Sequence, residues 1–373
     1  MTPRTAAAIP IARPQLGEEE KRQVLRVLDS GTLVAGPRVA EFEAAFAAYL
    51  GVPHAVSTSS GSTALHIALL ALGIGCGDRV VTTPFTFGAP SHAIIHVGAV
   101  PVFVDVDPTT ANLDPGAVED ALRGGGVRAI LAVHLYGLPA SMPDLRELAD
   151  RYGVLLIEDC AQAHGASIGG RKVGTFGDAA IFSFYPTKNM TTGEGGMVVT
   201  ADPAVARRAR LLVDPRGDAE YAYEVVGFNF RMTEVAGAIG LVQLAALDAR
   251  NEQRRANARR LSEGLGDLAW LEVPREPRGY RHVYHQYTIR VRRHRDELSR
   301  HLTALGIGNR VYYPALVPFT PAYRRRGFGG TYPHAEQLTR NVLSLPVYPG
   351  LRPEEVDAVV EGVRAFQVPD DEL

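Results

Sequence analysis

Apolar runs and amphipathic segments alternate along the first two hundred residues of the chain. A short run at 79–83 contains Val80 and Val81, and the runs at 129–133 and 154–157 are apolar throughout. Between the last two, residues 142–152 place Leu145, Leu148 and Ala149 on one helical face. Continuously apolar strands are typical of a parallel sheet that is covered on both sides. The alternation therefore predicts an α/β fold with a doubly wound sheet.

The pattern changes after Thr200, where longer polar and helical segments take over. One long helix is expected from Thr233 to about Leu265, capped by the Thr233 hydroxyl and rich in arginine toward its end. A strand is expected over 285–292 and helices over 296–305 and 353–366. Because 373 residues exceed the usual size of one domain, we predict a large domain over 1–245 and a small α+β domain over 246–373, linked by the helix 233–265.

Composition narrows the class of protein. A hydrophobic content of 46% with 21% charged residues is ordinary for a soluble enzyme, and 39 basic against 41 acidic residues argue against nucleic acid or membrane partners. No segment has the length of a membrane span or the pattern of a signal peptide. Cys76 and Cys160 are too few for a disulfide framework or a structural zinc site. We therefore expect a cytoplasmic enzyme without a metal.

One lysine stands in a loop between two expected strands. Lys188 follows the apolar run 179–184 and Pro186, and a second strand is expected over 198–200, after the glycines at 195 and 196. A lysine that is partly withdrawn from water has a lowered pKa and reacts as an amine with carbonyl cofactors. Taken alone, Lys188 would more often be an ordinary surface lysine.

Two other features change that balance. The Gly/Ser/Thr cluster at 59–63 precedes an apolar helix, so free backbone N–H groups at Gly61 to Thr63 could bind a phosphate. Asp159 follows the apolar strand at the edge where ligands bind in open α/β sheets. With Lys188, and with Phe87 as an aromatic ring to stack, they form the set that pyridoxal phosphate chemistry requires. The alternatives are simple helix caps at 59–63 and Asp159 and a core position for Phe87.

These motifs, in this order, resemble the DegT/DnrJ/EryC1/StrS family of sugar aminotransferases over nearly the whole chain. The resemblance rests on Gly61-Ser-Thr-Ala-Leu65, Glu158-Asp-Cys-Ala-Gln-Ala-His-Gly165, Ser183-Phe-Tyr-Pro-Thr-Lys-Asn189 and Asn229-Phe-Arg-Met-Thr-Glu234, and on segments 84–87, 102–107, 133–137, 174–178 and 193–196. It implies a fold-type I aminotransferase, with a large mixed sheet and a smaller C-terminal domain, that acts as a homodimer with pyridoxal phosphate.

The resemblance also assigns roles to residues. Lys188 would carry the internal aldimine and move protons at the substrate carbon, and Asp159 would pair with the pyridine nitrogen. Gln162 would bind the ring oxygen, and Phe87 would cover one face of the ring. The phosphate would be held by Ser62, Thr63 and Ser183, with Asn229 reaching in from the neighbouring subunit. Positions implied near the substrate are Tyr185, Arg231, Tyr312 and Tyr313; Arg231 could instead only pair with Glu234.

The implied reaction moves an amino group from glutamate or glutamine to the keto carbon of a nucleotide-linked keto-deoxysugar. Pyridoxamine phosphate would be the intermediate form of the cofactor. Such a reaction belongs to amino sugar biosynthesis in secondary metabolism. Alternatives are amination of a cyclitol ketone, a pyridoxamine-dependent sugar dehydratase, and a non-catalytic sensor. Lys188 counts against the dehydratase, in which histidine replaces the lysine. Residues 213–217 read Val-Asp-Pro-Arg-Gly where many relatives have Asn-His-Gly, so the sugar, its reacting carbon and its nucleotide stay open.

Overall fold

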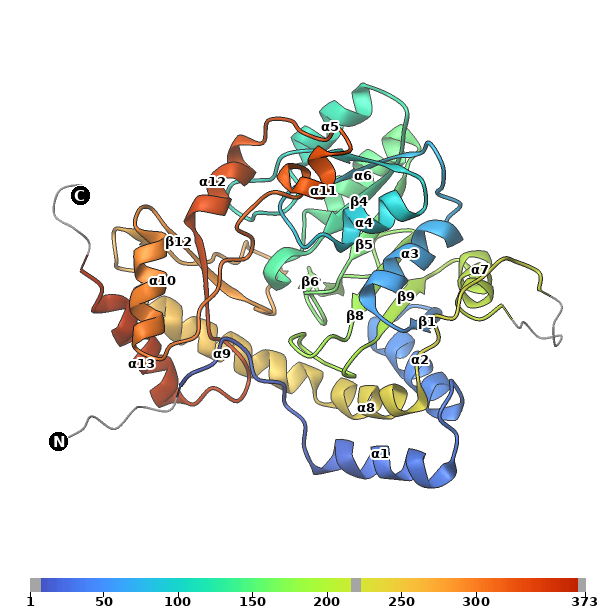
Figure 1. Cartoon of the computed structure of the whole chain (residues 1–373), viewed down its shortest axis with the longest axis horizontal. Helices are drawn as coiled ribbons and strands as arrows, with labels where there is room; N and C mark the ends of the chain where they lie inside the picture. Colours follow the sequence, from blue (N-terminus) through green and yellow to red (C-terminus); the bar gives the residue numbers. More distant parts are fainter. Residues whose placement is uncertain (1–7, 216–222, 368–373) are drawn as a thin grey trace.

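A seven-stranded mixed sheet forms the centre of the protein in the computed structural model, which describes residues 8–215 and 223–367 (Figure 1). Strand β9 lies antiparallel between its two neighbours, and the other pairs are parallel. The expected doubly wound mixed sheet is thereby confirmed. Its strands in spatial order are β1 (His54–Thr58), β9 (Gly196–Thr200), β8 (Ala179–Ser183), β5 (Leu155–Asp159), β4 (Val127–Val133), β2 (Arg79–Thr82) and β3 (Val100–Phe103).

Helices cover both faces of this sheet because successive strand residues point to opposite sides. Ile157 packs into the core under one set of helices, while its neighbour Leu156 packs into the core on the other side. The first set is α3 (Gly61–Ala71), α4 (Ala89–His96) and α7 (Pro203–Val213). The opposite face carries α2 (Pro37–Leu50), α5 (Pro115–Arg123), α6 (Met142–Tyr152) and α8 (Glu234–Ala245), with α1 (Glu18–Ser30) outside α8.

A separate apolar core belongs to the C-terminal part of the chain. A three-stranded sheet of order β10-β12-β13 packs there against helices, at the left of Figure 1. Its elements are β10 (Leu271–Glu272), β12 (Tyr287–Val291), β13 (Val342–Leu345), α9 (Leu247–Leu265), α10 (Arg295–Ala304) and α13 (Pro353–Arg364). The remaining elements are β6 (Ser167–Ile168), β7 (Arg171–Lys172), β11 (Tyr280–Arg281), α11 (Pro321–Arg324), α12 (Pro333–Asn341) and the 3-10 turns Leu135–Gly137 and Val317–Phe319.

The prediction of a single helix over 233–265 is wrong. Two helices, α8 and α9, meet at Ala246, whose φ of −96° and ψ of −5° interrupt the helical backbone. Helix α8 packs on α1 and α2, whereas α9 packs on α13 of the C-terminal core. The break therefore lies where the chain passes from one core to the other. The expected cap is confirmed, because the Thr233 hydroxyl accepts the N–H of Ala236.

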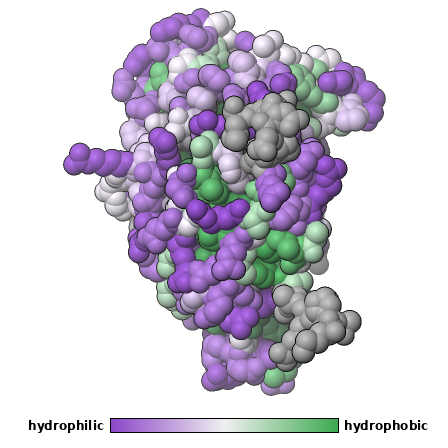
Figure 2. Space-filling model, turned by 90° about the vertical axis from the view of Figure 1, so that its left-hand side faces the viewer, coloured by the Kyte–Doolittle hydropathy of each residue, from purple (hydrophilic) through white to green (hydrophobic). Residues whose placement is uncertain are grey.

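Most of the surface on the C-terminal side is hydrophilic. Figure 2 shows this face with hydrophobic side chains gathered near its centre. None of the described helices is both long enough and apolar enough to cross a lipid bilayer.

Candidate functional site

Lys188 and Asp159 come together at the carboxyl ends of adjacent parallel strands. Asp159 ends β5, and Lys188 lies in the loop that follows β8. Burial raises the pKa of Asp159, although the Ala161 N–H and the charge of Lys188 oppose the rise. Burial lowers the pKa of Lys188 to about 8, and the Asp159 carboxylate opposes part of that shift. The site therefore holds an amine that is easily made neutral beside a buried carboxyl group.

The side chain of Asp159 is arranged to meet a cation. Its Oδ1 accepts the N–H of Ala161 at 2.9 Å, which closes a turn and not a helix, so the helix-cap alternative for Asp159 is wrong. The residue is 5% exposed, and it makes no ion pair within residues 8–215 and 223–367. A buried carboxylate without a cation is costly unless a ligand supplies the positive charge.

The first turn of α3 forms an anion-binding surface next to β8. The Ser60 hydroxyl accepts the N–H of Thr63 at 3.1 Å, and the Thr63 hydroxyl donates to the Ser60 carbonyl oxygen, so both hydroxyls close the cap. Among the described residues, nothing accepts the backbone N–H groups of Gly61 and Ser62. Ser183, the last residue of β8, lies directly against Gly61. Free N–H groups at a helix start with a nearby hydroxyl are a phosphate-binding arrangement.

The anion-binding surface depends on the close approach of Gly61 to Ser183, and this approach can be tested by mutation. A Cβ at this position would lie 2.5 Å from the Ser183 Cβ and 3.2 Å from its Cα. Gly61→Ala is therefore expected to push the helix start away from Ser183, to destabilise the protein by about 1–3 kcal/mol and to weaken cofactor binding. Thermal unfolding and titration with pyridoxal phosphate measure the two effects. Gly73→Ala, two residues beyond the other end of α3, also strains a backbone of positive φ (76°) and should lower stability, but it should leave cofactor affinity unchanged.

Gln162 is held at both ends of its amide. Its Oε1 accepts the N–H of Tyr136 at 2.7 Å, and its Nε2 donates to the Tyr313 hydroxyl at 3.2 Å. Tyr136 also donates from its own hydroxyl to the Tyr312 carbonyl oxygen. No role for Tyr136 could be predicted from local patterns, because its partners lie 26 and 176 residues away. Tyr136 thus ties the expected cofactor residue Gln162 to the expected substrate segment.

Phe87 and Tyr185 present large rings to solvent, with exposed fractions of 61% and 48%. The core alternative for Phe87 is therefore wrong, and its ring is available for stacking. His164 and His285 are buried near Lys188. Burial lowers the pKa of His164 to about 3, and both of its ring nitrogens lack a partner in the described structure. No sequence pattern singled out His285.

Asn229 and Arg231 lie in an extended segment before α8. The side chain of Asn229 is exposed, whereas Arg231 donates to Asp214 at 3.1 Å. The alternative that pairs Arg231 with Glu234 is wrong, because the Glu234 carboxylate accepts backbone N–H groups at the start of α2. The segment 213–217 is the one in which the chain differs from the Asn-His-Gly motif of many relatives. Its residues 216 and 217 lie outside the described residues.

Backbone bonds fix the ends of the loop between α7 and this segment. The N–H of Phe228 donates to Leu212 and that of Phe230 to Val213, at 2.7 and 3.2 Å. The Phe230 carbonyl oxygen in turn accepts the N–H of Ser59 at 2.7 Å. Asn229 is thereby set beside the strand end that leads into the anion-binding turn of α3.

These residues fit pyridoxal phosphate. The helix start and Ser183 match its phosphate, the unpaired Asp159 matches a protonated ring nitrogen, and Lys188 matches its aldehyde. A metal fits less well. His134, Glu158 and Cys160 lie close together, but the Glu158 carboxylate already has partners. It accepts three backbone N–H groups, and it also accepts a hydrogen bond from His134 Nε2 at 3.1 Å when that nitrogen is protonated. That cluster holds the 174–177 turn.

Comparison with known proteins also points to pyridoxal phosphate chemistry. The model of the DegT/DnrJ/EryC1/StrS aminotransferase family matches residues 14–364. The chain is 43% identical to a dTDP-3-amino-3,4,6-trideoxy-alpha-D-glucose transaminase of Streptomyces venezuelae, over 95% of this chain and 94% of that one. It is 42% identical to a "pleiotropic regulatory protein" of Geobacillus stearothermophilus, over 94% and 95%. The crystal structure of S. venezuelae DesV with a ketimine intermediate superposes with a TM-score of 0.94 at 41% identity, over 98% of this chain and all of that one.

Proposed function

Because the chain belongs to the DegT/DnrJ/EryC1/StrS aminotransferase family, we propose that it moves an amino group from glutamate or glutamine to the keto carbon of a nucleotide-linked keto-deoxysugar. The protein is a pyridoxal phosphate-dependent sugar aminotransferase. The observation that carries the proposal is that Lys188, whose pKa is lowered to about 8, lies near the buried Asp159, which forms no ion pair within the described residues. The similarity to a dTDP-aminosugar transaminase supports the choice of acceptor.

Each proposed residue has a distinct task. When bound, pyridoxal phosphate supplies an aldehyde and a ring that accepts electrons from the substrate carbon. Lys188 would hold the cofactor through its neutral amine and would then take and return the proton at the substrate carbon. Asp159 holds the proton on the pyridine nitrogen. Gln162 orients the ring oxygen, and Phe87 excludes water from one face of the ring.

The remaining site residues receive proposed roles around this centre. The phosphate is held by the Gly61 and Ser62 N–H groups, by the Ser62 and Ser183 hydroxyls, and by Asn229 of a second subunit, which makes the active unit a homodimer. The Thr63 hydroxyl joins them when it turns from the Ser60 carbonyl oxygen to the phosphate. Exposure of the Asn229 side chain supports this assignment. Substrate contacts are proposed for Tyr185, Arg231, Tyr312 and Tyr313. The domain boundary at 245/246 remains a prediction.

The first experiment is an absorption spectrum of the purified protein before and after addition of L-glutamate. Loss of the visible cofactor band, with appearance of the pyridoxamine form, is expected. A panel of nucleotide-linked 3- and 4-keto sugars and cyclitol ketones then identifies the acceptor. A band that persists with both glutamate and glutamine contradicts the proposal, as does a product that has lost oxygen without gaining nitrogen. Cofactor that binds but never turns over would point to a sensor.

The pKa of Lys188 predicts how cofactor uptake depends on pH. Only the neutral amine reacts with an aldehyde, so the uptake rate of the cofactor-free protein should rise about tenfold per pH unit below pH 8 and level off above it. A lysine with its ordinary pKa of 10.5 would keep the rate rising to that value. Stopped-flow absorbance from pH 6 to 10 measures this profile. A profile without a bend near pH 8 contradicts the assignment.

A further inference from the structure

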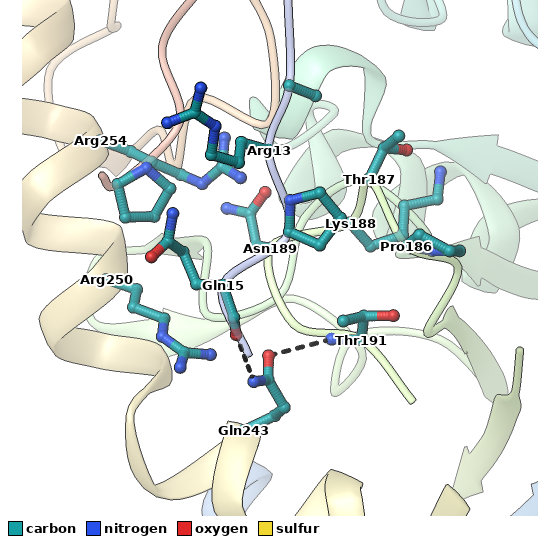
Figure 3. A pocket seen from close by; sticks show the side chains of 13 residues that line it. Arg13, Gln15, Pro186, Thr187, Lys188, Asn189, Thr191, Gln243, Arg250 and Arg254 are labelled. Carbon is teal, nitrogen blue, oxygen red and sulfur yellow. Dashed lines mark hydrogen bonds between the residues drawn. The ribbon is translucent and has the colours of Figure 1, made fainter. Parts of the chain in front are cut away.

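A small pocket with positively charged walls lies beside the loop that carries Lys188 (Figure 3). It is formed by the N-terminal segment 12–15, the loop 186–191, helices α8 and α9, and one proline of the C-terminal part. Four of its lining residues are basic, and none is acidic. The polar and charged side chains are Arg13, Gln15, Thr187, Lys188, Asn189, Thr191, Gln243, Arg250 and Arg254.

Arg254 is the least compensated charge in this pocket. It is 6% exposed, and Nη1 makes only long hydrogen bonds to the carbonyl oxygens of Tyr284 and His285, at 3.3 and 3.4 Å. Its Nε is buried and has no partner in the described structure. No described carboxylate forms an ion pair with it. Burial lowers the pKa of Arg254 to about 10, with a further contribution from Arg250. A buried guanidinium in this state attracts an anion.

The two other arginines add to this charge. Arg250 lies 3.5 Å from Glu20, whose carboxylate also accepts hydrogen bonds from Gly17 and Gln243. Arg13 lies over the ring of Tyr348 at 5.8 Å and forms no ion pair within the described chain. Figure 3 shows the side chains of Arg13 and Arg254 at the same end of the pocket, with Arg250 below them. Of the three guanidinium groups, only that of Arg250 lies within ion-pair distance of a described carboxylate.

We propose that this pocket binds a single small inorganic anion, such as chloride, between Arg254, Arg250 and Arg13. The space open to the centre of a water-sized particle is about 10 Å³, which suits one small ion held among the three arginines. Water would fill the space but would leave the positive charge uncompensated. The bound anion links the N-terminal segment to α9, next to the Lys188 loop. The pocket shares Lys188 with the proposed active site, but its test measures anion binding and does not depend on the sugar reaction.

The test is the thermal unfolding of the holoenzyme in sodium chloride and in sodium gluconate at equal ionic strength, so that general screening is the same. Chloride should raise the unfolding temperature with the logarithm of its concentration above its dissociation constant, reaching about 3 °C at a hundredfold excess over that constant. Arg254→Gln should abolish the difference between the salts. Arg259→Gln is the matched control, because Arg259 is exposed on the same helix, and it should keep the wild-type difference.

A second variant covers the case in which Arg254→Gln does not fold. Arg13 is exposed, so Arg13→Gln should fold normally and should need a higher chloride concentration for the same rise in unfolding temperature. Crystals soaked in bromide should show an anomalous peak among the three arginines. Equal unfolding temperatures in the two salts, an Arg13→Gln variant with the wild-type dependence on chloride, or no bromide peak in this pocket would each overturn the proposal.

Discussion

Lys188→Ala is expected to lower the rate of amino transfer by at least about 10³-fold, because one side chain supplies both the nucleophilic amine and the proton transfer. The fold should be retained. Lys188 is only half-buried, lies in a loop, and makes no side-chain hydrogen bond in the described structure. Single-turnover kinetics with glutamate and thermal unfolding measure the two properties. Lys21→Ala, on the outer helix α1, should keep the wild-type rate. A Lys188→Ala enzyme as fast as wild type would end the assignment.

The same variant tests the shared active site. In a mixture of Lys188→Ala with Asn229→Ala subunits, half of the dimers pair unlike chains. Each of these has one site with both native residues. Mixing two weakly active proteins should therefore restore up to about a quarter of the wild-type activity. No recovery after confirmed subunit exchange would contradict the proposed place of Asn229 in the neighbouring site.

Asp159→Asn should have opposite effects on catalysis and on stability. The amide keeps the size of the side chain and the acceptor for the Ala161 N–H, but it removes the negative charge that holds the ring proton. We expect a loss of about 10²–10³-fold in the rate of amino transfer, similar to the removal of one preorganised electrostatic group. Steady-state kinetics at saturating cofactor measure this loss.

The stability effect follows from the raised pKa of Asp159. The folded carboxyl group releases its proton at higher pH than the unfolded one, whose ordinary pKa is 3.8. The free energy of unfolding therefore falls as the pH rises from 3.8 through the raised pKa of the folded Asp159 carboxyl group. At neutral pH the ionised side chain destabilises the folded protein by its full amount. The cofactor-free Asp159→Asn protein should consequently unfold at a higher temperature than wild type at pH 7. The difference should shrink toward pH 4. A lower unfolding temperature at pH 7 would show that the carboxylate is compensated in the folded protein.

Local patterns were sufficient for most of the fold. Strands β4 and β5 and helices α3 and α6 are each marked by their own apolar spacing and by flanking glycine or hydroxyl residues. The break at Ala246 was missed because favourable helix-forming residues run through it, without glycine or proline at the junction. It results from packing against two different cores. The insertion of β9 between β1 and β8 likewise depends on contacts between distant segments.

In the candidate site, too, some residues could be predicted from local patterns and others depend on tertiary contacts. Lys188, Asp159 and the α3 start could be predicted because each is attached to a neighbouring strand or helix pattern. The hydrogen bonds of Gln162 with Tyr136 and Tyr313, and of Arg231 with Asp214, join residues that no local pattern connects. Arg231 was assigned an alternative partner three residues away, but Glu234 turns instead toward α2. Side-chain choices of this kind are decided by tertiary contacts.

The loop after α7 has both ends pinned by the bonds of Phe228 and Phe230 to Leu212 and Val213. A loop with fixed ends tolerates changes in length at small entropic cost. Its intervening residues can therefore be rewritten while Asn229 stays in register with the phosphate-binding turn. An insertion or deletion between 213 and 228 should therefore leave the Phe230–Ser59 bond, and with it the backbone position of Asn229, unchanged.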